Sequence, residues 1–455
     1  MDPALTALRG PAFTFRHDPF LGDPETSLAF EPDALIVMRG GRIVGYGGHS
    51  AERERYPADL PVAHHPDALI CAGFVDAHVH YPQLEMIGAF GETLLDWLQR
   101  YTYPTELRFA DRSHAERVAA VFLRDLLRAG VTTAAVYCTV HEHSVDAFFA
   151  EAERVGARMV AGKVLMDRHA PPALLDGADH GAAATERLIA RWHGRGRALY
   201  AVTPRFAPAL TDEGLRVAGR LWCDAPGTLM QTHLCETEAE IAWVRELFPG
   251  RASYLDVYAE AGLVGPGAVF GHAVHMAEGD LAALHRARCG LAHCPTSNLF
   301  LGSGLFRAHD ARRADRPVRV GIGSDVGAGT SLSPLRTLGE AYKVARLGGS
   351  RLTAEQGFWL ATRGGAEALG LEDRIGTLAP GMEADLVVLD PAATDLLAFR
   401  MEAAGTLAER LFALMTLGDE RCVRATYVAG VPVWMRPDRP DDQAVPAGGL
   451  RRISQ

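Results

Sequence analysis

The feature that most constrains the fold is an alternation of strand-like and helix-like segments through the middle of the chain. Short apolar runs recur between residues 74 and 325, and segments with helical periodicity separate several of them. Eight strand–helix units within about 250 residues predict an α/β fold of the (β/α)8 TIM-like barrel type, with a doubly wound open sheet as the alternative. The expected strands are Phe74–His80, Val131–Tyr137, Ala157–Val164, Leu199–Phe206, Thr228–His233, Ala268–Val274, Gly290–Cys294 and Val318–Asp325.

Helix signals support this alternation. One helix is expected from near Ser113 to Gly130, and another begins at the capping residue Thr211. Two further helices, 335–347 and 354–369, are expected after the last strand. The barrel is therefore expected to carry additional helices at its C-terminal side.

Strand-like segments also flank the barrel region at both ends of the chain. Hairpins are predicted around Gly40-Gly41 and Ala429-Gly430, and 384–389 has the pattern of a further strand. An isolated hairpin is marginal in water, so we expect both ends to form one small β-sandwich domain. The predicted limits are 1–70 and 376–455 for the two parts of the sandwich domain, and 71–375 for the catalytic barrel.

Composition excludes several classes of protein. The formal net charge of −10 argues against a general nucleic-acid or anionic-membrane binder. No stretch approaches the 18 apolar residues of a membrane span, and the first residues lack a secretory signal pattern. The 7 scattered cysteines contain no Cys-x-x-Cys, which is typical of reduced thiols. A cytoplasmic protein is expected.

Metal-binding residue types gather at the carboxyl ends of the expected strands, where barrel enzymes carry their active sites. His78 and His80 share one face of the first strand, and His233, His272 and Asp325 lie at the ends of later strands. A bare His-x-His pair is weak evidence, but this whole set at one end of a barrel is not. Three of these imidazoles and the carboxylate suit zinc, with iron as a substitute, and leave a position for water.

A carboxylate follows one of these histidines closely. Glu236 lies three positions after His233. Beside a metal site, such a carboxylate can take a proton from activated water and pass it to a leaving group. The alternative is a glutamate favoured by the dipole at a helix start. The proximity of the metal set favours the catalytic role.

Two other features bear on the number of metal ions. His141-Glu142-His143 is a second His-x-His, but no histidine or carboxylate set remains to complete a second site, so a surface or pocket-wall role is favoured. Lys163 is the one lysine on an expected strand and the one candidate for a carbamate between two metals. The strand 199–206 has no lysine, and one metal ion is therefore predicted.

Several of these segments resemble the amidohydrolase superfamily and, within it, the members that deaminate guanine. The resemblance runs from about residue 73 to 347 and less distinctively across the flanking domain. Cys235 departs from it where many relatives have serine, as does the doubled histidine of 141–143. The resembling segments are 75–80, 80–83, 203–208, 231–236, 293–298 and 324–331.

The resemblance implies an enzyme of guanine catabolism that hydrolyses guanine to xanthine and ammonia, and it implies a homodimer. One Zn²⁺ per chain would lower the pKa of its water toward neutrality, and Glu236 would carry the proton to the purine ring. His272 and Asp325 would hydrogen-bond the hydroxide and the tetrahedral intermediate. The implied metal ligands are His78, His80, His233 and Asp325.

The resemblance also implies the substrate contacts. Gln83 and Arg205 suit the polar edge of guanine, and Phe206 and Trp97 offer aromatic faces. Ordinary helix packing is the alternative for Trp97. The competing functions are another mononuclear deaminase of the superfamily, acting on a different heterocycle or on formiminoglutamate, and a non-catalytic scaffold. The presence of every ligand and of Glu236 disfavours the scaffold.

Overall fold

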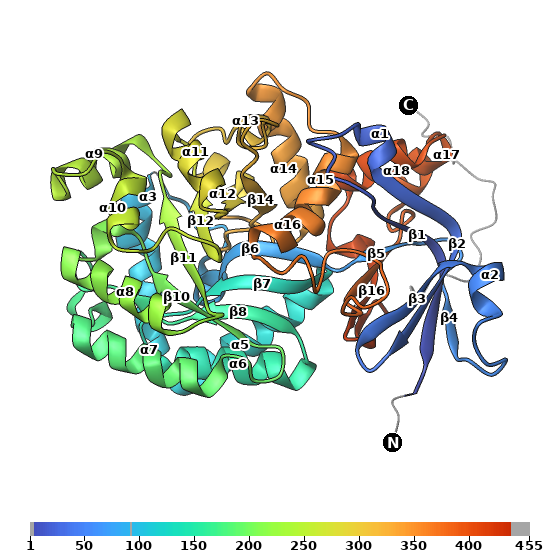
Figure 1. The fold of residues 1–455 in the computed structure, drawn as a ribbon, viewed down its shortest axis with the longest axis horizontal. Helices are drawn as coiled ribbons and strands as arrows, with labels where there is room; N and C mark the ends of the chain where they lie inside the picture. Colours follow the sequence, from blue (N-terminus) through green and yellow to red (C-terminus); the bar gives the residue numbers. More distant parts are fainter. Residues whose placement is uncertain (1–3, 92, 438–455) are drawn as a thin grey trace, which may run out of the picture.

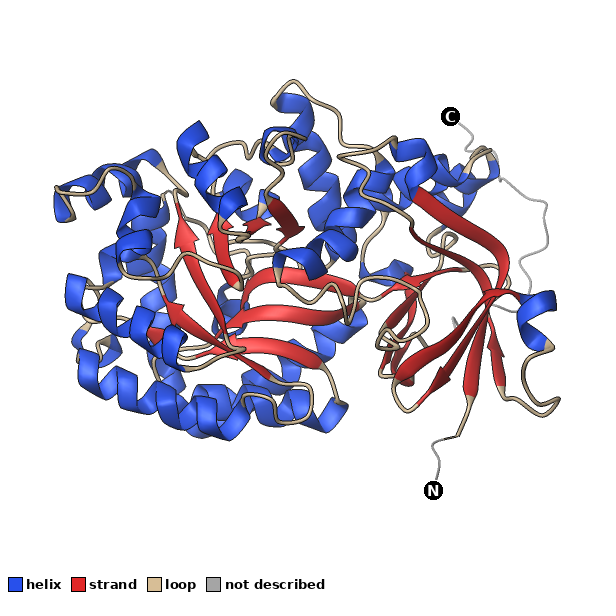
Figure 2. Cartoon of the chain, in the orientation of Figure 1, coloured by secondary structure: helices blue, strands red, loops and turns tan. Residues whose placement is uncertain are grey.

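A near-closed parallel barrel and a second sheet lie side by side in the molecule (Figures 1 and 2). The structure, a computed structural model, describes residues 4–91 and 93–437. The barrel strands follow one another in chain order, and each pairs in parallel with its neighbours. They are β6 Phe74–His80, β7 Val131–Tyr137, β8 Arg158–Gly162, β10 Leu199–Pro204, β11 Leu229–Leu234, β12 Ala268–His272, β13 Gly290–His293 and β14 Arg319–Ile322.

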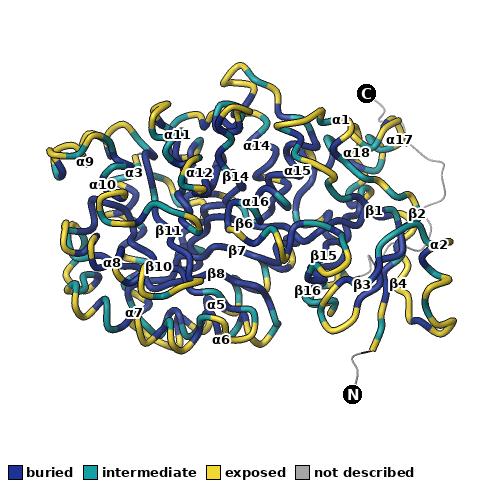
Figure 3. Tube along the Cα trace, in the orientation of Figure 1, coloured by how far each residue is buried: buried dark blue, intermediate teal, exposed yellow. Residues whose placement is uncertain are grey.

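Backbone hydrogen bonds just beyond β14 bring the first and last strands together. The Asp325 N–H donates to the His78 carbonyl over 2.9 Å, and the His80 N–H donates to the Val326 carbonyl over 3.0 Å. The barrel predicted from the alternation is therefore confirmed, and the open-sheet alternative is wrong. The strands are the buried centre of this part of the molecule (Figure 3).

One expected strand is interrupted. The run 157–164 forms β8 and the two-residue β9 Val164–Leu165, which pairs with β10, and Lys163 lies between them. Its buried ammonium forms an ion pair with Asp176. A charged side chain in a strand core needs such a partner, and the chain bends here to provide it.

Helices surround the barrel, and their starts follow local capping. α5 begins after Asp111, whose carboxylate accepts from the Ser113 N–H, and α8 begins after Thr211, as expected. The expected helix 354–369 is two helices, α15 and α16, because Thr362 leaves helical geometry between them. The helices of eight or more residues in the barrel region are α5 Arg112–Arg128, α6 Glu142–Val155, α7 Ala178–Trp192, α8 Asp212–Asp224, α9 Glu238–Leu247, α11 Glu278–Arg286, α14 Pro334–Leu347 and α15 Ala354–Ala361; shorter ones are α3 Leu94–Trp97, α4 Tyr103–Leu107, α10 Tyr254–Glu260, α12 Pro295–Phe300, α13 Ala308–Ala311 and α16 Arg363–Ala368.

The second sheet combines both ends of the chain, as the sequence predicts. β5 and β15 pair antiparallel, with Ile70 opposite Val388, and thereby join the N-terminal strands to the C-terminal hairpin. The domain limits given above stay predictions. The strands of this sheet are β1 Thr6–Phe15, β2 Leu28–Arg39, β3 Arg42–Gly48, β4 Val62–His64, β5 Leu69–Ala72, β15 Leu386–Leu389, β16 Val423–Val428 and β17 Val431–Met435.

Buried polar contacts fasten this sheet to the amino ends of the barrel strands. The Gly73 N–H donates to the Asp385 carbonyl over 2.8 Å, and the Thr426 hydroxyl donates to the Leu127 carbonyl over 2.7 Å. Helix α18 Leu407–Leu417, which follows α17 Asp395–Glu402, packs on α14 through an edge-to-face contact of Phe412 with Tyr342. No helix among residues 4–91 and 93–437 is long and apolar enough to cross a membrane.

Candidate metal centre and active site

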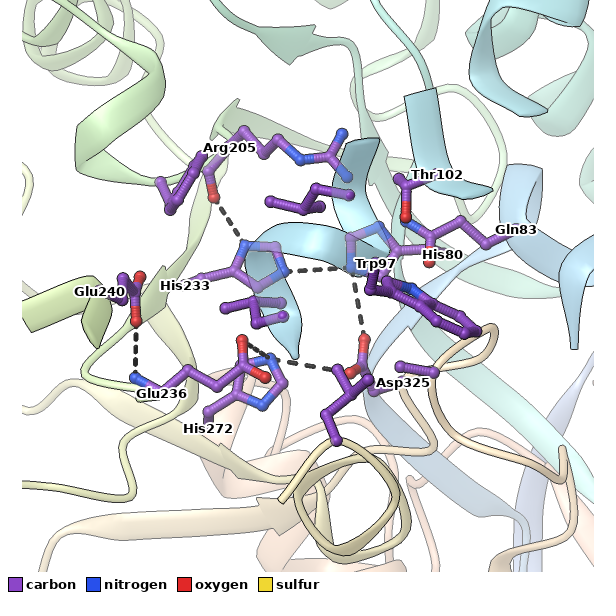
Figure 4. Close-up of a pocket in the computed structure, with 15 residues that line it drawn as sticks. His80, Gln83, Trp97, Thr102, Arg205, His233, Glu236, Glu240, His272 and Asp325 are labelled. Atoms are coloured by element: carbon purple, nitrogen blue, oxygen red, sulfur yellow. Dashed lines mark hydrogen bonds and ion pairs between the residues drawn. The ribbon is translucent and has the colours of Figure 1, made fainter. Parts of the chain in front are cut away.

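Four predicted ligands converge at the carboxyl ends of the barrel strands. Figure 4 shows His80, His233 and Asp325 of this set. His78 and His80 come from β6, His233 from β11, and Asp325 from the loop after β14. The Nε2 atoms of His80 and His233 are 3.2 Å apart. Asp325 Oδ1 lies 3.2 Å from His78 Nε2 and 3.4 Å from His80 Nε2. These side chains therefore offer three nitrogens and one oxygen to a common point.

The chemistry of this cluster suits a divalent cation. Burial lowers the pKa of His78, His80 and His233, so the imidazoles are neutral and present lone pairs. Burial opposes the charge of Asp325, but the surrounding imidazoles outweigh it and hold the pKa of this carboxyl below its ordinary value. His78 Nε2 is buried and makes no well-aligned hydrogen bond, although Asp325 Oδ1 lies 3.2 Å away. A divalent cation would supply what this donor set lacks.

A second layer of contacts orients the ligands. The Arg205 carbonyl lies 2.6 Å from His233 Nδ1 and accepts its hydrogen, which leaves Nε2 to face the other imidazoles. Asp325 adopts a left-handed backbone with φ of 47°, and His272 has φ of 67°. Such conformations are costly for residues other than glycine and gather at functional sites, where they aim side chains.

Glu236 and His272 form a pair beside the metal cluster. Glu236 Oε2 lies 3.5 Å from His272 Nε2, and the Ser303 hydroxyl donates to Glu236 Oε1 over 3.0 Å. Burial raises the pKa of Glu236 to about 7, against the opposing effect of His272. His272 Nδ1 is 2.9 Å from Asn298 Oδ1, and its Nε2 is 3.7 Å from Asp325 Oδ2. Burial opposes a charge on His272, but the two carboxylates raise its pKa overall.

One pocket is lined by His80, His233, Glu236, His272 and Asp325, and its empty space, including the part open to solvent, is about 450 Å³. Gln83, Trp97, Arg205 and Phe206 all contribute to its wall and are nearly fully buried. Trp97 also packs against Phe300, with ring centroids 5.8 Å apart, so the helix-packing interpretation and the pocket interpretation both describe it. The catalytic and substrate-binding roles of the named residues stay predictions.

The pocket wall and the residues that contact it include functional candidates that the sequence reasoning missed. Glu106 binds Arg205, Thr102 places a buried hydroxyl at the pocket wall, and Glu240 accepts the Glu236 N–H over 2.9 Å. Thr102 and Glu106 are four residues apart, which puts both on one helical face. Glu240 completes a capping box with Thr237. The sequence contains both spacings, Thr102 to Glu106 and Thr237 to Glu240. It does not show that these residues lie near the pocket.

The second His-x-His has no part in the ligand cluster. His143 Nε2 lies 2.6 Å from the Phe109 carbonyl, and His141 starts helix α6. Among the described residues, every group of histidine, cysteine and acidic side chains close enough to share a metal ion includes His78. The ion pair of Lys163 with Asp176 holds the ammonium away from a bridging role.

Comparison with known proteins agrees with this geometry. Residues 69–433 match the amidohydrolase family. The chain is 47% identical to guanine deaminase of Escherichia coli strain K12, over 90% of this chain and 93% of that protein. The solved E. coli guanine deaminase superposes with a TM-score of 0.92 at 44% identity, covering 95% of this chain and 100% of the other. Guanine deaminase of C. acetobutylicum with bound guanine gives 0.84 at 26% identity, covering 94% and 100%. The chain therefore belongs to the amidohydrolase family.

Proposed function

We propose that this chain hydrolyses guanine to xanthine and ammonia with one zinc ion per chain. The observation that carries the proposal is the convergence of a complete ligand set, Glu236 and Arg205 on one buried pocket. The similarity to guanine deaminases over most of the chain supports it. In the reaction, water adds to the carbon that bears the exocyclic amino group, and that group leaves as ammonia while the added oxygen becomes a carbonyl.

His78, His80, His233 and Asp325 hold the ion, for which zinc is proposed and iron is the substitute. A divalent ion at this position supplies Lewis acidity, which makes a water molecule acidic enough to lose a proton near neutral pH. The neutral imidazoles and the ionised aspartate supply one negative charge in the ligand set.

Glu236 moves the proton. A carboxyl group with a pKa of about 7 takes and releases protons with similar ease at neutral pH, which suits a group that serves first as base and then as acid. Ser303 fixes Oε1 of this carboxylate, and Oε2 faces His272. Glu236 thus accepts the proton of the attacking water and delivers it to the ring nitrogen next to the attacked carbon.

His272 and Asp325 stabilise the oxygen that adds to the ring. Asn298 holds His272 by its Nδ1 atom, so that Nε2 points toward Glu236 and Asp325. A donor fixed before the reaction costs little reorganisation when charge develops on the intermediate.

The opposite wall of the pocket holds the substrate. Arg205 donates to the carbonyl oxygen of guanine, and Gln83 binds the same polar edge. Phe206 and Trp97 pack against the ring faces. All four side chains line the pocket. With the ring held in this way, we propose that the amino-bearing carbon lies beside Glu236.

We further propose a cytoplasmic homodimer that serves guanine catabolism. Seven free cysteines support a reducing compartment, and the family resemblance supports the dimer. Size-exclusion chromatography with light scattering tests the dimer. The mass of a single chain would contradict this proposal.

The test of the activity is ammonia release from guanine, adenine, cytosine and formiminoglutamate, with metal quantified on the same sample. We expect turnover of guanine and one metal ion per chain. Turnover of another compound with guanine inert would identify a different deaminase of the family. Metal-loaded protein inert on every compound would favour a scaffold, and two ions per chain would contradict the single-metal proposal.

A further inference from the structure

The guanidinium at the pocket wall is already paired inside the protein. Arg205 is buried, and its Nη1 atom donates to both carboxylate oxygens of Glu106, over 2.9 and 2.8 Å. Glu106 lies on α4 and is itself buried. Within the described residues, no hydrogen bond engages Arg205 Nε or Nη2. The pair therefore holds the arginine by one nitrogen and leaves donors for a ligand (Figure 4).

The partner of Arg205 also contacts Gln83, the other polar residue proposed to bind the substrate. Gln83 Nε2 donates to Glu106 Oε1 over 3.3 Å, and Gln83 Oε1 accepts from the Gly327 N–H over 3.3 Å. The Tyr103 ring lies under the guanidinium at 5.7 Å. One carboxylate thus fixes the orientation of both polar groups on this wall.

Charge compensation has a consequence for the ligand. An unpaired buried arginine attracts an anion strongly, because burial leaves its charge without solvent. The carboxylate of Glu106 cancels that charge while the remaining N–H groups of Arg205 stay available. Such a wall donates to a neutral carbonyl and repels a ligand that carries its own negative charge.

We propose that Glu106 is a specificity-determining positioning residue, which orients Arg205 and Gln83 and makes the pocket select a neutral oxopurine over an anionic one. The inference rests on the proposed function, because it takes Arg205 and Gln83 as the groups that face the purine. It explains why an acidic residue is buried behind two residues of the wall, Arg205 and Gln83, in a pocket whose proposed substrate is uncharged.

The test compares neutral and anionic oxopurines on the metal-loaded enzyme. Hypoxanthine is neutral, and xanthine loses a proton near neutral pH, so dissociation constants measured by calorimetry at mildly alkaline pH give an anion-to-neutral affinity ratio. In Glu106→Gln, we expect this ratio to rise about tenfold, the size of one charge-assisted hydrogen bond gained or lost. The KM for guanine rises by a similar factor, with a smaller change in kcat.

A matched variant separates selectivity from folding. Glu383 forms a buried pair with Arg158, at 2.6 Å between Oε2 and Nε, at the other end of the barrel. Glu383→Gln breaks the same type of pair and is expected to lower the melting temperature without moving the purine ratio. Glu106→Asp keeps the charge on a shorter side chain, so the ratio stays near wild type while the KM for guanine rises.

The outcomes are distinct. An unchanged ratio in folded Glu106→Gln, as in Glu383→Gln, would overturn the inference. If Glu106→Gln does not fold, Glu106→Asp provides the test. A tenfold shift of its affinity ratio toward the anion, or an unchanged KM for guanine, would contradict the inference. If wild-type protein leaves guanine unconverted, the proposed function fails, and the binding ratios still decide the role of Glu106.

Discussion

Buried charged and polar groups are paired differently at the two ends of the barrel strands. At the amino ends, Arg158 and Arg197 meet Glu383 and Asp385 of the second sheet, and every charge has an opposite partner. At the carboxyl ends, three imidazoles share the single carboxylate of Asp325, and His78 Nε2 makes no well-aligned hydrogen bond. Compensated charges fasten two parts of a protein together, whereas uncompensated polar groups at a strand end await a ligand.

A pair of glutamates shows the same difference. Burial raises the pKa of Glu236 to about 7, because the opposing effect of His272 does not outweigh it. Burial also opposes the charge of Glu383, but hydrogen bonds from Arg158 and the charge of Arg197 outweigh it and lower the pKa of that carboxyl. A glutamate thus serves proton transfer at the carboxyl ends of the strands and joins the barrel to the second sheet at the amino ends. The neighbouring charges determine which role it has.

The largest expected effect comes from Glu236→Gln. Because the proton path is lost, kcat should fall by roughly 10²–10⁴-fold. Metal content should not change, because Glu236 is outside the ligand set. Thermal stability should not fall, because a buried carboxylate with a raised pKa is replaced by a neutral amide. Ammonia release, elemental analysis and a melting curve test this, and retained turnover would mean that another base serves.

The same substitution at the other end should have the opposite profile. Glu383→Gln leaves Arg158 buried without its carboxylate, and the free energy of unfolding should fall by about 3 kcal/mol. Arg197 keeps its bond to Asp385 over 2.9 Å, which limits the loss. Denaturant unfolding measures the effect, and kcat is expected to stay within twofold. A large loss of kcat with stability intact would remove the distinction between the two ends.

Lowering the pH should affect activity through Glu236 before it affects stability through Glu383. Protonation of Glu236 begins near pH 7, so kcat/KM should fall toward tenfold per unit as the pH drops below that value. The pKa of Glu383 is lowered from its ordinary 4.5, so its contribution to stability is present above about pH 4.5 and is lost as the pH falls further. Activity should therefore decline at pH 5–6 while the melting temperature difference between wild type and Glu383→Gln persists. Loss of activity and of the melting temperature difference over the same pH range would contradict this prediction.

The smallest expected effect concerns the Thr102 hydroxyl. It is buried without a protein partner, and its residue lines the pocket. If it hydrogen-bonds the purine, Thr102→Val should raise the KM for guanine about fivefold, the value of one neutral hydrogen bond of about 1 kcal/mol. Thr102→Ser keeps the hydroxyl and serves as control. An unchanged KM in the valine variant would leave the hydroxyl without a role in binding.

Most of the scaffold was predictable because its signals are local. Apolar runs located β6 and β7 to the residue, and Thr211 marked the start of α8. The interruption at Lys163 and the break at Thr362 were missed. Lys163 depends on Asp176, which arrives from a later segment, and at Thr362 the side chain bonds the Phe358 carbonyl over 2.6 Å instead of continuing the helix.

The candidate site divides along the same line. The sequence alone determined which residue types sit at strand ends, and therefore that imidazoles and one carboxylate would share an end of the barrel. Only the tertiary structure decided which groups compensate one another. Glu106 meets Arg205 across 99 positions of sequence, and Glu383 meets Arg158 across 225. Periodicity records which face a residue occupies, but electrostatic compensation depends on distances that the closed barrel alone establishes.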